Sequence, residues 1–329
     1  MDIELVGRLT GSKKEKWARF LVQADLEADD QVQQTVLVWE DGVLIATGSR
    51  WGNLLKCIAV DPGHQGEGLT ATVVTQLRQD AFRQGYSHLF LYTKPKNQAM
   101  FASLFFYPIA MTDTVLLMEN RQNGIGQFLD TLPAKSHSGQ VGAAVMNCNP
   151  FTKGHRYLIE TAARECQWLY VFVLSEDKSQ FSADDRLQMV RLGTQDLPNV
   201  TVLPTGPYLI SEATFPTYFL PDREQAGQIH CLLDIEIFCQ YYAPKFGINR
   251  RYIGTEPLSG VTAQYNEALK ANLPPRGIAV RELPRLESAE QPISASAVRA
   301  QLSDGDPDAL GQLLPPSTYD YLKKHGFLK

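Results

Sequence analysis

A short polar segment near the middle of the chain has the residue types of a phosphate-binding loop. Residues 147–155 read NCNPFTKGH and lie between an apolar run, predicted to be a strand, and a predicted helix. The N-terminus of a helix offers unpaired N–H groups and a partial positive charge, which suit a phosphate group. Gly154 lets a phosphate approach the backbone, because no Cβ lies in the way. Thr152 and His155 add side-chain donors, and His155 in this position can stabilise charge on a departing phosphate group.

These side chains also have a structural interpretation. Thr152 and His155 can simply cap the helix that follows them. Asn149 stands before Pro150, where it either contributes to ligand binding or only shapes the turn. Both interpretations predict the same local backbone, so the segment by itself leaves the choice open.

A second polar segment, residues 293–299 with the sequence ISASAVR, has a similar character. Ser294 and Ser296 can cap a helix, and the same helix end can take up phosphate oxygens. Arg299 follows one turn later, and its planar guanidinium can hold the β- or γ-phosphate of a nucleotide with two hydrogen bonds. The alternatives are that the serines are simple caps and that Arg299 is a solvated helix residue.

Together the two segments resemble the motifs of a known superfamily. Thr152-x-Gly154-His155 at the end of a strand is similar to the HxGH motif of the nucleotidylyltransferase superfamily, and ISASAVR is similar to its ISxSxxR motif. The longer string MNCNPFTKGHRYLIE resembles the citrate lyase ligase family more specifically. The strings SEDKSQFSADDRLQMV and YIGTEPLSGVTAQYNEALK resemble it in order and spacing. The resemblance therefore covers the chain from Gly139 onward.

The resemblance implies an ATP site with catalytic roles for Thr152, His155 and Arg299. It implies further ATP contacts at glycine and polar residues, namely Asn149, Gly154, Ser294, Ser296 and Gly254. Gly254 belongs to the string YIGTEP at a strand end, where the superfamily holds its nucleotide. Magnesium is expected to accompany ATP, and no side-chain ligand for a metal is identified.

A glycine-rich loop in the first part of the chain resembles the acyl-CoA loop of GNAT acetyltransferases. Residues 60–70 read VDPGHQGEGLT, between a predicted strand and a predicted long helix. In the family pattern Arg/Gln-x-x-Gly-x-Gly/Ala, Gln65 and Gly68 match, whereas Thr70 departs at the small-residue position. Gly66 and Gly68 free the backbone to wrap a pyrophosphate, so the resemblance implies that Gln65, Gly66 and Gly68 bind a CoA-like arm. The alternative is a GNAT-shaped domain that no longer binds CoA, and no GNAT catalytic residue is assigned.

Residues 1–130 have the element pattern of an α+β domain. Helices are predicted at 13–23 and 69–84, the second ended by Gly85. Strands are predicted on both sides of the hairpin signal Asp41-Gly42 and at 56–60, 88–94 and 114–120. We therefore expect a GNAT-like α+β domain at 1–130.

From residue 139 the pattern changes to an alternation of strands and helices. Short apolar runs typical of buried parallel strands lie at 140–147, 168–175, 200–206, 250–255 and 278–285. The alternation favours a doubly wound, Rossmann-like parallel sheet, in which ligands bind at the carboxyl ends of the strands. We expect a nucleotidylyltransferase-like catalytic domain at 139–329. Residues 207–228 contain prolines and aromatic pairs of mixed spacing and resist assignment.

Composition narrows the class of protein further. The chain has 31 Lys and Arg against 36 Asp and Glu, a net charge of −5, and its basic residues form no stripe, so we expect neither nucleic acid nor a membrane as partner. Five cysteines without a CxxC pair argue against a disulfide framework and a structural zinc site. No apolar run approaches the ~20 residues of a membrane helix, and the N-terminus lacks an apolar signal core. We therefore expect a cytoplasmic protein.

The resemblance implies a particular reaction. Acetate and ATP give acetyl-AMP and pyrophosphate, and the acetyl group then passes to the thiol of the phosphoribosyl-dephospho-CoA prosthetic group on the acyl carrier subunit of citrate lyase. The GNAT-like domain would present this CoA-like arm to the adenylating domain. One alternative is an adenylyltransferase that makes a dinucleotide or a CoA precursor. Another is a regulatory protein that binds acyl-CoA and ATP without turnover.

Overall fold

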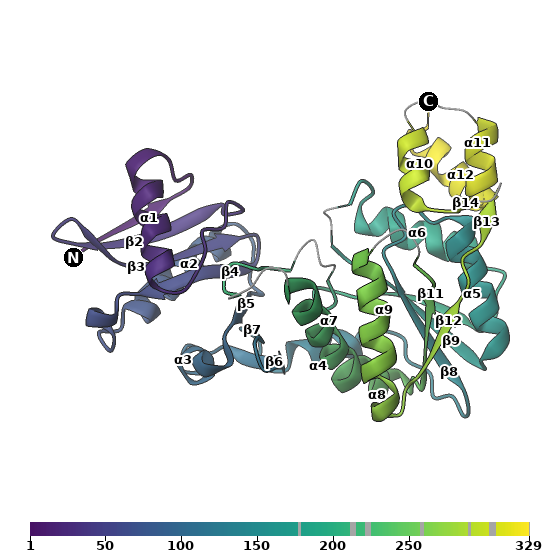
Figure 1. Cartoon of the computed structure of the whole chain (residues 1–329), viewed down its shortest axis with the longest axis horizontal. Helices are drawn as coiled ribbons and strands as arrows, with labels where there is room; N and C mark the ends of the chain where they lie inside the picture. The colour runs from purple at the N-terminus through teal and green to yellow at the C-terminus, as the bar shows by residue number, and fades with distance from the viewer. Residues whose placement is uncertain are drawn as a thin grey trace. The chain divides into compact units, whose positions relative to one another are not determined.

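A computed structural model describes residues 1–176, 179–210, 215–220, 225–256, 260–288, 291–302 and 307–328 (Figure 1). The chain divides into two compact units, each with its own sheet. The first unit combines Met1–Gln127 with Pro216–Ile229, and the second combines Phe128–Phe215 with His230–Lys329. Part of the segment that resisted assignment from sequence therefore belongs to the first unit.

The first unit is built on a seven-stranded sheet in the order β1-β2-β3-β4-β5-β7-β6. Its strands are β1 (Asp2–Val6), β2 (Gln34–Glu40), β3 (Val43–Trp51), β4 (Leu54–Val60), β5 (Phe90–Thr93), β6 (Tyr107–Met111) and β7 (Leu116–Glu119). Neighbouring strands are antiparallel except β4 and β5, which are parallel. The hairpin predicted at Asp41-Gly42 is confirmed, because β2 ends and β3 begins at this dipeptide.

The parallel strands β4 and β5 pair over a short stretch only. Leu54 faces Phe90 and Leu55 faces Leu91, although β4 continues to Val60. Cys57 interrupts β4 with a φ of +52°, at the position where the pairing of β3 with β4 shifts register. The second half of β4 is thus not hydrogen-bonded to β5, which leaves an opening between the two strands.

Helices pack on this sheet as their apolar faces predict. They are α1 (Gly11–Gln23), α2 (Leu69–Arg83) and α3 (Gln98–Ser103), and the predicted helices 13–23 and 69–84 are confirmed. Helix α2 contributes Leu69, Val73 and Leu77 to a core that the strands complete. Gly85 follows the end of α2 with a φ of +86°, a conformation that favours glycine.

The second unit is built on a five-stranded sheet in the order β10-β9-β8-β11-β12. Its strands are β8 (Val141–Met146), β9 (Trp168–Val173), β10 (Val200–Pro204), β11 (Arg250–Gly254) and β12 (Ala279–Leu283). All of its neighbouring strands are parallel, so the predicted doubly wound parallel sheet is confirmed. The chain reverses its winding direction between β8 and β11, and this switch point is where such sheets bind ligands.

Helices cover both faces of the second sheet. The remaining helices of the chain are α4 (Gly124–Asp130), α5 (Lys153–Glu165), α6 (Ala183–Thr194), α7 (Ala226–Ile237), α8 (Ala243–Phe246), α9 (Gly260–Asn272), α10 (Ala295–Gln301), α11 (Pro307–Leu313) and α12 (Pro316–Lys324), of which α4 and α7 begin in the first unit. Helices α5 and α6 share one apolar core with α10, α11 and α12. On the opposite face, Tyr170 and Phe172 of β9 pack against Phe246 of α8. None of the described helices has the length and apolar character needed to span a lipid bilayer.

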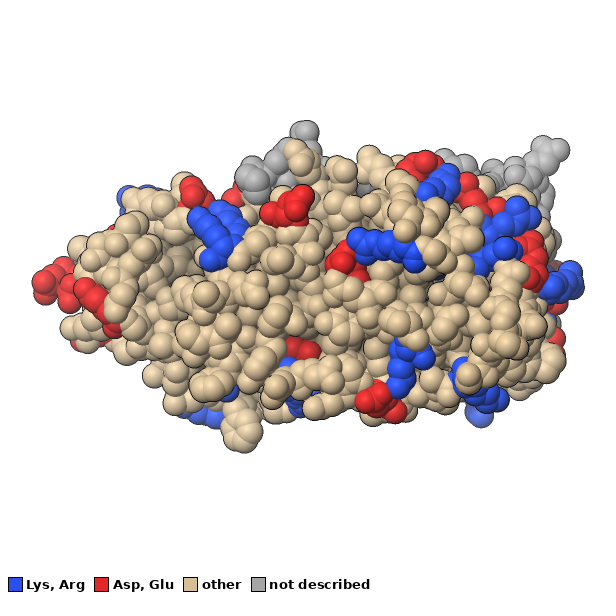
Figure 2. Space-filling view, turned by 90° about the horizontal axis from the view of Figure 1, so that it is seen from below, with Lys and Arg blue, Asp and Glu red and all other residues tan. Residues whose placement is uncertain are grey.

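Charged side chains are interspersed on the surface. On the face shown in Figure 2, basic and acidic residues are scattered among uncharged ones and form no continuous stripe of one sign. This distribution agrees with the small net charge of −5.

Candidate functional site

A cavity of about 590 Å³ lies at the switch point between β8 and β11 of the second sheet. It is lined by every residue that the sequence predicted for ATP binding and catalysis: Asn149, Thr152, Gly154, His155, Gly254, Ser294, Ser296 and Arg299. The fold therefore brings the segments 147–155 and 293–299 together at one place. The segment that begins at Tyr252 contributes Gly254, while residues 257–259 lie outside the described part of the chain.

Thr152 and His155 form a reciprocal cap at the start of helix α5. The Thr152 hydroxyl oxygen accepts a hydrogen bond from the His155 N–H at 3.4 Å, and the His155 Nδ1 accepts one from the Thr152 N–H at 3.0 Å. Because Nδ1 is an acceptor in this arrangement, the proton of a neutral imidazole lies on Nε2. The capping role and a donor role are thus compatible in one residue, since Nε2 takes no part in the cap.

The environment keeps His155 neutral. Burial, with a smaller contribution from the positive charge of Arg285, lowers the pKa of His155 to about 4. At neutral pH the side chain therefore carries no charge and offers a single N–H donor. A neutral imidazole of this kind can stabilise an oxyanion by donating a hydrogen bond.

Asn149 is occupied on two sides by the protein. Its side-chain oxygen accepts a hydrogen bond from the Phe181 N–H at 3.3 Å, and its carbonyl oxygen accepts one from Arg299 Nη1 at 2.7 Å. These contacts give Asn149 a definite role in shaping the loop. Asn149 also lines the cavity.

The polar residues of the second motif are Ser294, Ser296 and Arg299, and Arg299 forms the hydrogen bond to the first motif. Ser294 is the N-cap of α10 and accepts a hydrogen bond from the Ala297 N–H at 3.1 Å. Arg299 Nη2 donates to the Ser296 hydroxyl oxygen at 2.9 Å, while Nη1 reaches Asn149. Arg299 therefore ties the two motifs together as well as lining the cavity.

Gly154 is needed for this closure. A Cβ at Gly154 would lie 3.3 Å from the carbonyl oxygen of Ile293, which is tighter than an ordinary contact. The absent side chain thus lets the start of α5 approach the backbone that precedes α10. The sequence predicted an open backbone at Gly154, and the structure adds a packing reason for it.

The cavity also contains charged residues that the sequence interpretation missed. Arg285 donates from Nε to the Thr255 carbonyl oxygen at 2.8 Å and forms an ion pair with Glu256. Glu256 directly follows β11 and Arg285 follows β12, so both stand at the carboxyl edge of the sheet. Their places after predicted strands were the available signal. Arg251 of β11 lines the same cavity and was also missed.

No thiol in the described chain is placed for nucleophilic chemistry. All five cysteines are free, and Cys148 beside the first motif is only 1 % exposed within the apolar core. Burial raises the pKa of Cys148 well above its usual range, so its thiol stays protonated. Packing at the end of the strand accounts for this residue.

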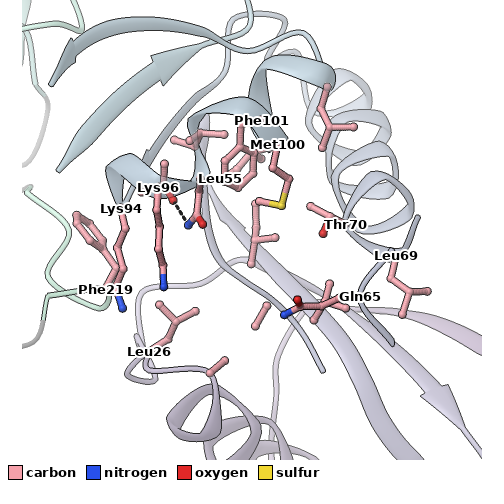
Figure 3. A pocket seen from close by; sticks show the side chains of 18 of the residues that line it. Leu26, Leu55, Gln65, Leu69, Thr70, Lys94, Lys96, Met100, Phe101 and Phe219 are labelled. Carbon is pink, nitrogen blue, oxygen red and sulfur yellow. Dashed lines mark hydrogen bonds between the residues drawn. The ribbon is translucent and has the colours of Figure 1, made fainter. Parts of the chain in front are cut away.

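A second cavity, of about 720 Å³, lies in the first unit (Figure 3). The loop residues Gln65, Gly66 and Gly68 line it, as the sequence predicted for an arm-binding groove. Gly66 has a φ of +90° and Gly68 a φ of +78°, and a Cβ at either would meet nothing within 4 Å. The space beside both glycines is therefore open, and their left-handed conformations explain why glycine is favoured.

The groove has a positively charged wall opposite this loop. Figure 3 shows Gln65 and Thr70 on one side, and Lys94 and Lys96 on the other. Two ammonium groups facing a glycine-rich loop suit a ligand that carries phosphates.

A segment from far along the chain completes the groove. The Tyr218 hydroxyl donates to the Tyr92 carbonyl oxygen of β5 at 3.1 Å, and the Tyr218 carbonyl oxygen accepts from the Glu27 N–H at 2.7 Å. Phe219 lines the cavity beside Lys94 (Figure 3). The groove is thus not made by the N-terminal sequence alone.

Comparison with known proteins agrees with the class that the two sheets and their cavities define. Residues 6–104 match the family described as "Acetyltransferase (GNAT) family", and residues 141–322 match "Citrate lyase ligase C-terminal domain". The predicted combination of a GNAT-like domain with a nucleotidylyltransferase-like α/β domain is thereby confirmed. Among solved structures, Escherichia coli ElaA is 12% identical, covers 36% of this chain and 99% of its own, and has a TM-score of 0.33.

Curated relatives identify the family. The "[Citrate [pro-3S]-lyase] ligase" of Escherichia coli (strain K12) is 40% identical over 97% of this chain and 92% of that protein. The relatives of the same name from Klebsiella pneumoniae and Haemophilus influenzae are 40% and 36% identical, over 94% and 93% of this chain and 92% and 94% of theirs. The chain belongs to the citrate lyase ligase family, and the predicted enzyme class is confirmed.

Proposed function

We propose that this enzyme activates acetate with ATP and acetylates the thiol of the CoA-like prosthetic group on the acyl carrier subunit of citrate lyase, in the cytoplasm. The observation that carries the proposal is the convergence of the segments 147–155 and 293–299 on one cavity at the switch point of the sheet. The names of the relatives supply the identity of the partner.

The first step requires stabilisation of charge and no general base. A carboxylate oxygen of acetate attacks the α-phosphorus of ATP, a new oxygen–phosphorus bond forms, and the bond to the bridging oxygen of the β-phosphate breaks. No proton is transferred, and the electron pair of the broken bond leaves on pyrophosphate. Donors at the leaving group are therefore the chemistry that the cavity must supply. The neutral His155 imidazole, the N–H groups at the start of α5 and the Arg299 guanidinium provide such donors.

The residues that line the cavity support ATP as the ligand, with magnesium carried on its phosphates. The start of α5 faces the cavity with Gly154, and a helix N-terminus of this kind suits phosphate oxygens. Within the described ranges, no group of three or more His, Cys, Asp or Glu side chains is placed to hold a metal ion. We propose that Mg²⁺ enters on the phosphates of ATP and keeps several waters, since this ion binds substrate phosphates and gives up its water reluctantly.

The groove of the first unit is proposed to hold the CoA-like arm for the second step. The thiol sulfur attacks the acetyl carbon of acetyl-AMP, a thioester forms, AMP leaves, and the thiol proton is released. The glycine-rich loop 65–68 would bind the pyrophosphate of the arm through its backbone. Lys94 and Lys96 supply positive charge opposite that loop.

The central test separates this function from its alternatives. Exchange of labelled pyrophosphate into ATP that depends on acetate, followed by acetylation of deacetylated citrate lyase, would support the proposal. Exchange that requires a nucleotide or a phosphorylated CoA precursor instead of acetate would indicate an adenylyltransferase. Binding of ATP and acyl-CoA without turnover would indicate a regulatory protein.

Replacement of Arg299 with lysine is expected to raise the ATP concentration for half-maximal exchange about tenfold. A guanidinium can hold Asn149, Ser296 and phosphate oxygens in one plane, whereas an ammonium acts as a point charge. The measurement is the exchange rate as a function of ATP concentration. Arg164→Lys is the control. Arg164 lies in the last turn of α5 with its side chain 78% exposed, so this variant should behave like the wild type. An unchanged ATP dependence of Arg299→Lys would contradict a phosphate role.

A further inference from the structure

A buried cation in the second unit has two nitrogen atoms for which the described residues offer no hydrogen-bond acceptor. Arg251 of β11 is 3% exposed, and its Nε and Nη1 atoms have no hydrogen-bond acceptor among the described residues. Its guanidinium lies over the ring of Phe238, with the central carbon 4.6 Å from the ring centre. A ring face attracts a cation but accepts none of its directed N–H groups in the plane of the guanidinium.

The neighbouring carboxylate does not satisfy Arg251. Asp234 accepts a hydrogen bond from the Tyr265 hydroxyl. Its charge attracts Arg251, but among the described residues no carboxylate accepts a hydrogen bond from the Arg251 Nε or Nη1. Burial raises the pKa of Asp234, so its charged form is disfavoured. Burying a charge without hydrogen-bonded partners is strongly unfavourable, and a polar group left in this state requires an explanation. The simplest explanation is that a ligand with negative charge binds to Arg251.

Arg251 is one of the residues that line the cavity of the switch point. Arg251, Tyr265 and Asn266 line this cavity together with the two motifs. Because Arg251 pairs with Ala143 of β8, the alternation of strand side chains puts Ile253 and Val145 on the same face of the sheet. Both also line the cavity. The sheet side of the cavity beside Arg251 is therefore formed largely by apolar side chains.

We propose that Arg251 binds the carboxylate of the acid substrate, a short monocarboxylate, in a subsite of this cavity that is distinct from the phosphate-binding motifs. The inference rests on the proposed function, because it assigns the acid to a place in the same reaction. A guanidinium binds a carboxylate with two parallel hydrogen bonds. A carboxylate offers about four lone-pair positions, so the bound oxygen keeps a lone pair for attack on phosphorus.

The subsite also explains how the cavity separates two anions. Phosphate oxygens are proposed to meet the start of α5 and Arg299, whereas the carboxylate meets Arg251. The apolar side chains of Val145 and Ile253 suit the hydrocarbon part of a short acid. A dicarboxylate would leave its second charge among these side chains and is expected to bind poorly.

The test is the substitution Arg251→Met, which keeps the length of the side chain and removes its charge. The acetate concentration for half-maximal ATP–pyrophosphate exchange should rise about 10- to 100-fold, while the ATP dependence stays unchanged. The thermal unfolding midpoint should not fall, because the variant removes an unpaired buried cation. Acetate should raise the unfolding midpoint of the wild-type protein with a non-hydrolysable ATP analogue bound, and should fail to do so in Arg251→Met.

Two controls make the outcome specific. Arg276→Met, at an arginine that pairs with Glu236 and does not line the cavity, should keep the wild-type acetate dependence. Arg251→Lys should recover part of the acetate affinity. An Arg251→Met variant with unchanged acetate dependence, or one that is destabilised and otherwise normal, would overturn the assignment. A wild-type enzyme without acetate-dependent exchange would instead overturn the proposed function, and acetate-induced stabilisation of wild type alone would still support the subsite.

Discussion

Replacement of His155 with asparagine is expected to lower acetate-dependent ATP–pyrophosphate exchange by about 10²–10³-fold, the usual effect of removing one preorganised donor to developing charge. The side-chain oxygen of asparagine can take over the role of Nδ1 and accept the Thr152 N–H, so the cap of α5 is retained. The donor at the position of Nε2 is lost. The variant should therefore combine wild-type thermal stability with a slow first step, measured by exchange and by the unfolding midpoint.

His155→Gln provides the reciprocal control. Its amide N–H can reach the position of Nε2, but the acceptor of the cap is lost, at a stability cost of about 1 kcal/mol. It should be less stable than His155→Asn and more active. Full activity in His155→Asn would show that the imidazole only caps the helix.

The pH dependence of the first step should follow from the same environment. Because the pKa of His155 is lowered to about 4, the neutral donor form predominates from neutral pH down to well below the ordinary histidine range. His155 should therefore contribute no change in exchange rate between pH 8 and 5.5. A loss of activity centred near pH 6.5 that disappears in His155→Asn would contradict the neutral assignment. The measurement is the exchange rate against pH in both proteins.

Replacement of Gly68 with valine is expected to reduce acetylation of the carrier thiol roughly 10- to 100-fold, because the loop would lose hydrogen bonds to the charged pyrophosphate of the arm, which are worth on the order of 1.5–3 kcal/mol. Gly68 has a φ of +78°, which a β-branched residue adopts only with strain. The added side chain would also enter the open space beside the loop, where the pyrophosphate of the arm is proposed to bind. Acetate-dependent exchange should remain near the wild-type rate, because its residues belong to the other unit.

Gly85→Val is the matched control for this experiment. Gly85 has a φ of +86°, its Cβ position is also open, and it follows the other end of the same helix. The two variants carry similar backbone strain, but only Gly68 lines the groove. Gly85→Val should lose stability and keep the transfer rate. Equal transfer rates in the two variants would make the first unit a docking or structural module.

Much of the fold could be predicted from the sequence because its signals are local. The alternation of apolar runs and helices from residue 139 predicts a parallel sheet, since a buried parallel strand is apolar on both faces. The dipeptide Asp41-Gly42 predicts a hairpin because of the φ values its turn needs. The edge strands β1 and β6 were not predicted, because β1 is largely exposed and β6 begins at Tyr107-Pro108 with no clear alternation.

The sequence by itself indicated that Thr152, His155, Ser294 and Ser296 are candidates for helix capping and phosphate binding, because capping depends on neighbours within one turn. The structure confirms the caps made by Thr152, His155 and Ser294, whereas Ser296 accepts a hydrogen bond from Arg299. Only the tertiary structure decided that the segments 147–155 and 293–299 share one cavity, since the order of strands in the sheet sets that meeting. Only the tertiary structure decided that Pro216–Ile229 belongs to the first unit, through contacts such as that of Tyr218 with Tyr92.

Arg251 shows the same division most clearly. The string RRYIG indicates that two adjacent arginines point to opposite faces of a strand, but it does not say which face is covered. The burial of Arg251, and the lack of an acceptor for its Nε and Nη1 among the described residues, depend on segments that pack on the sheet from elsewhere in the chain. The residue type was determined by the sequence, and its availability to a ligand was decided by long-range packing.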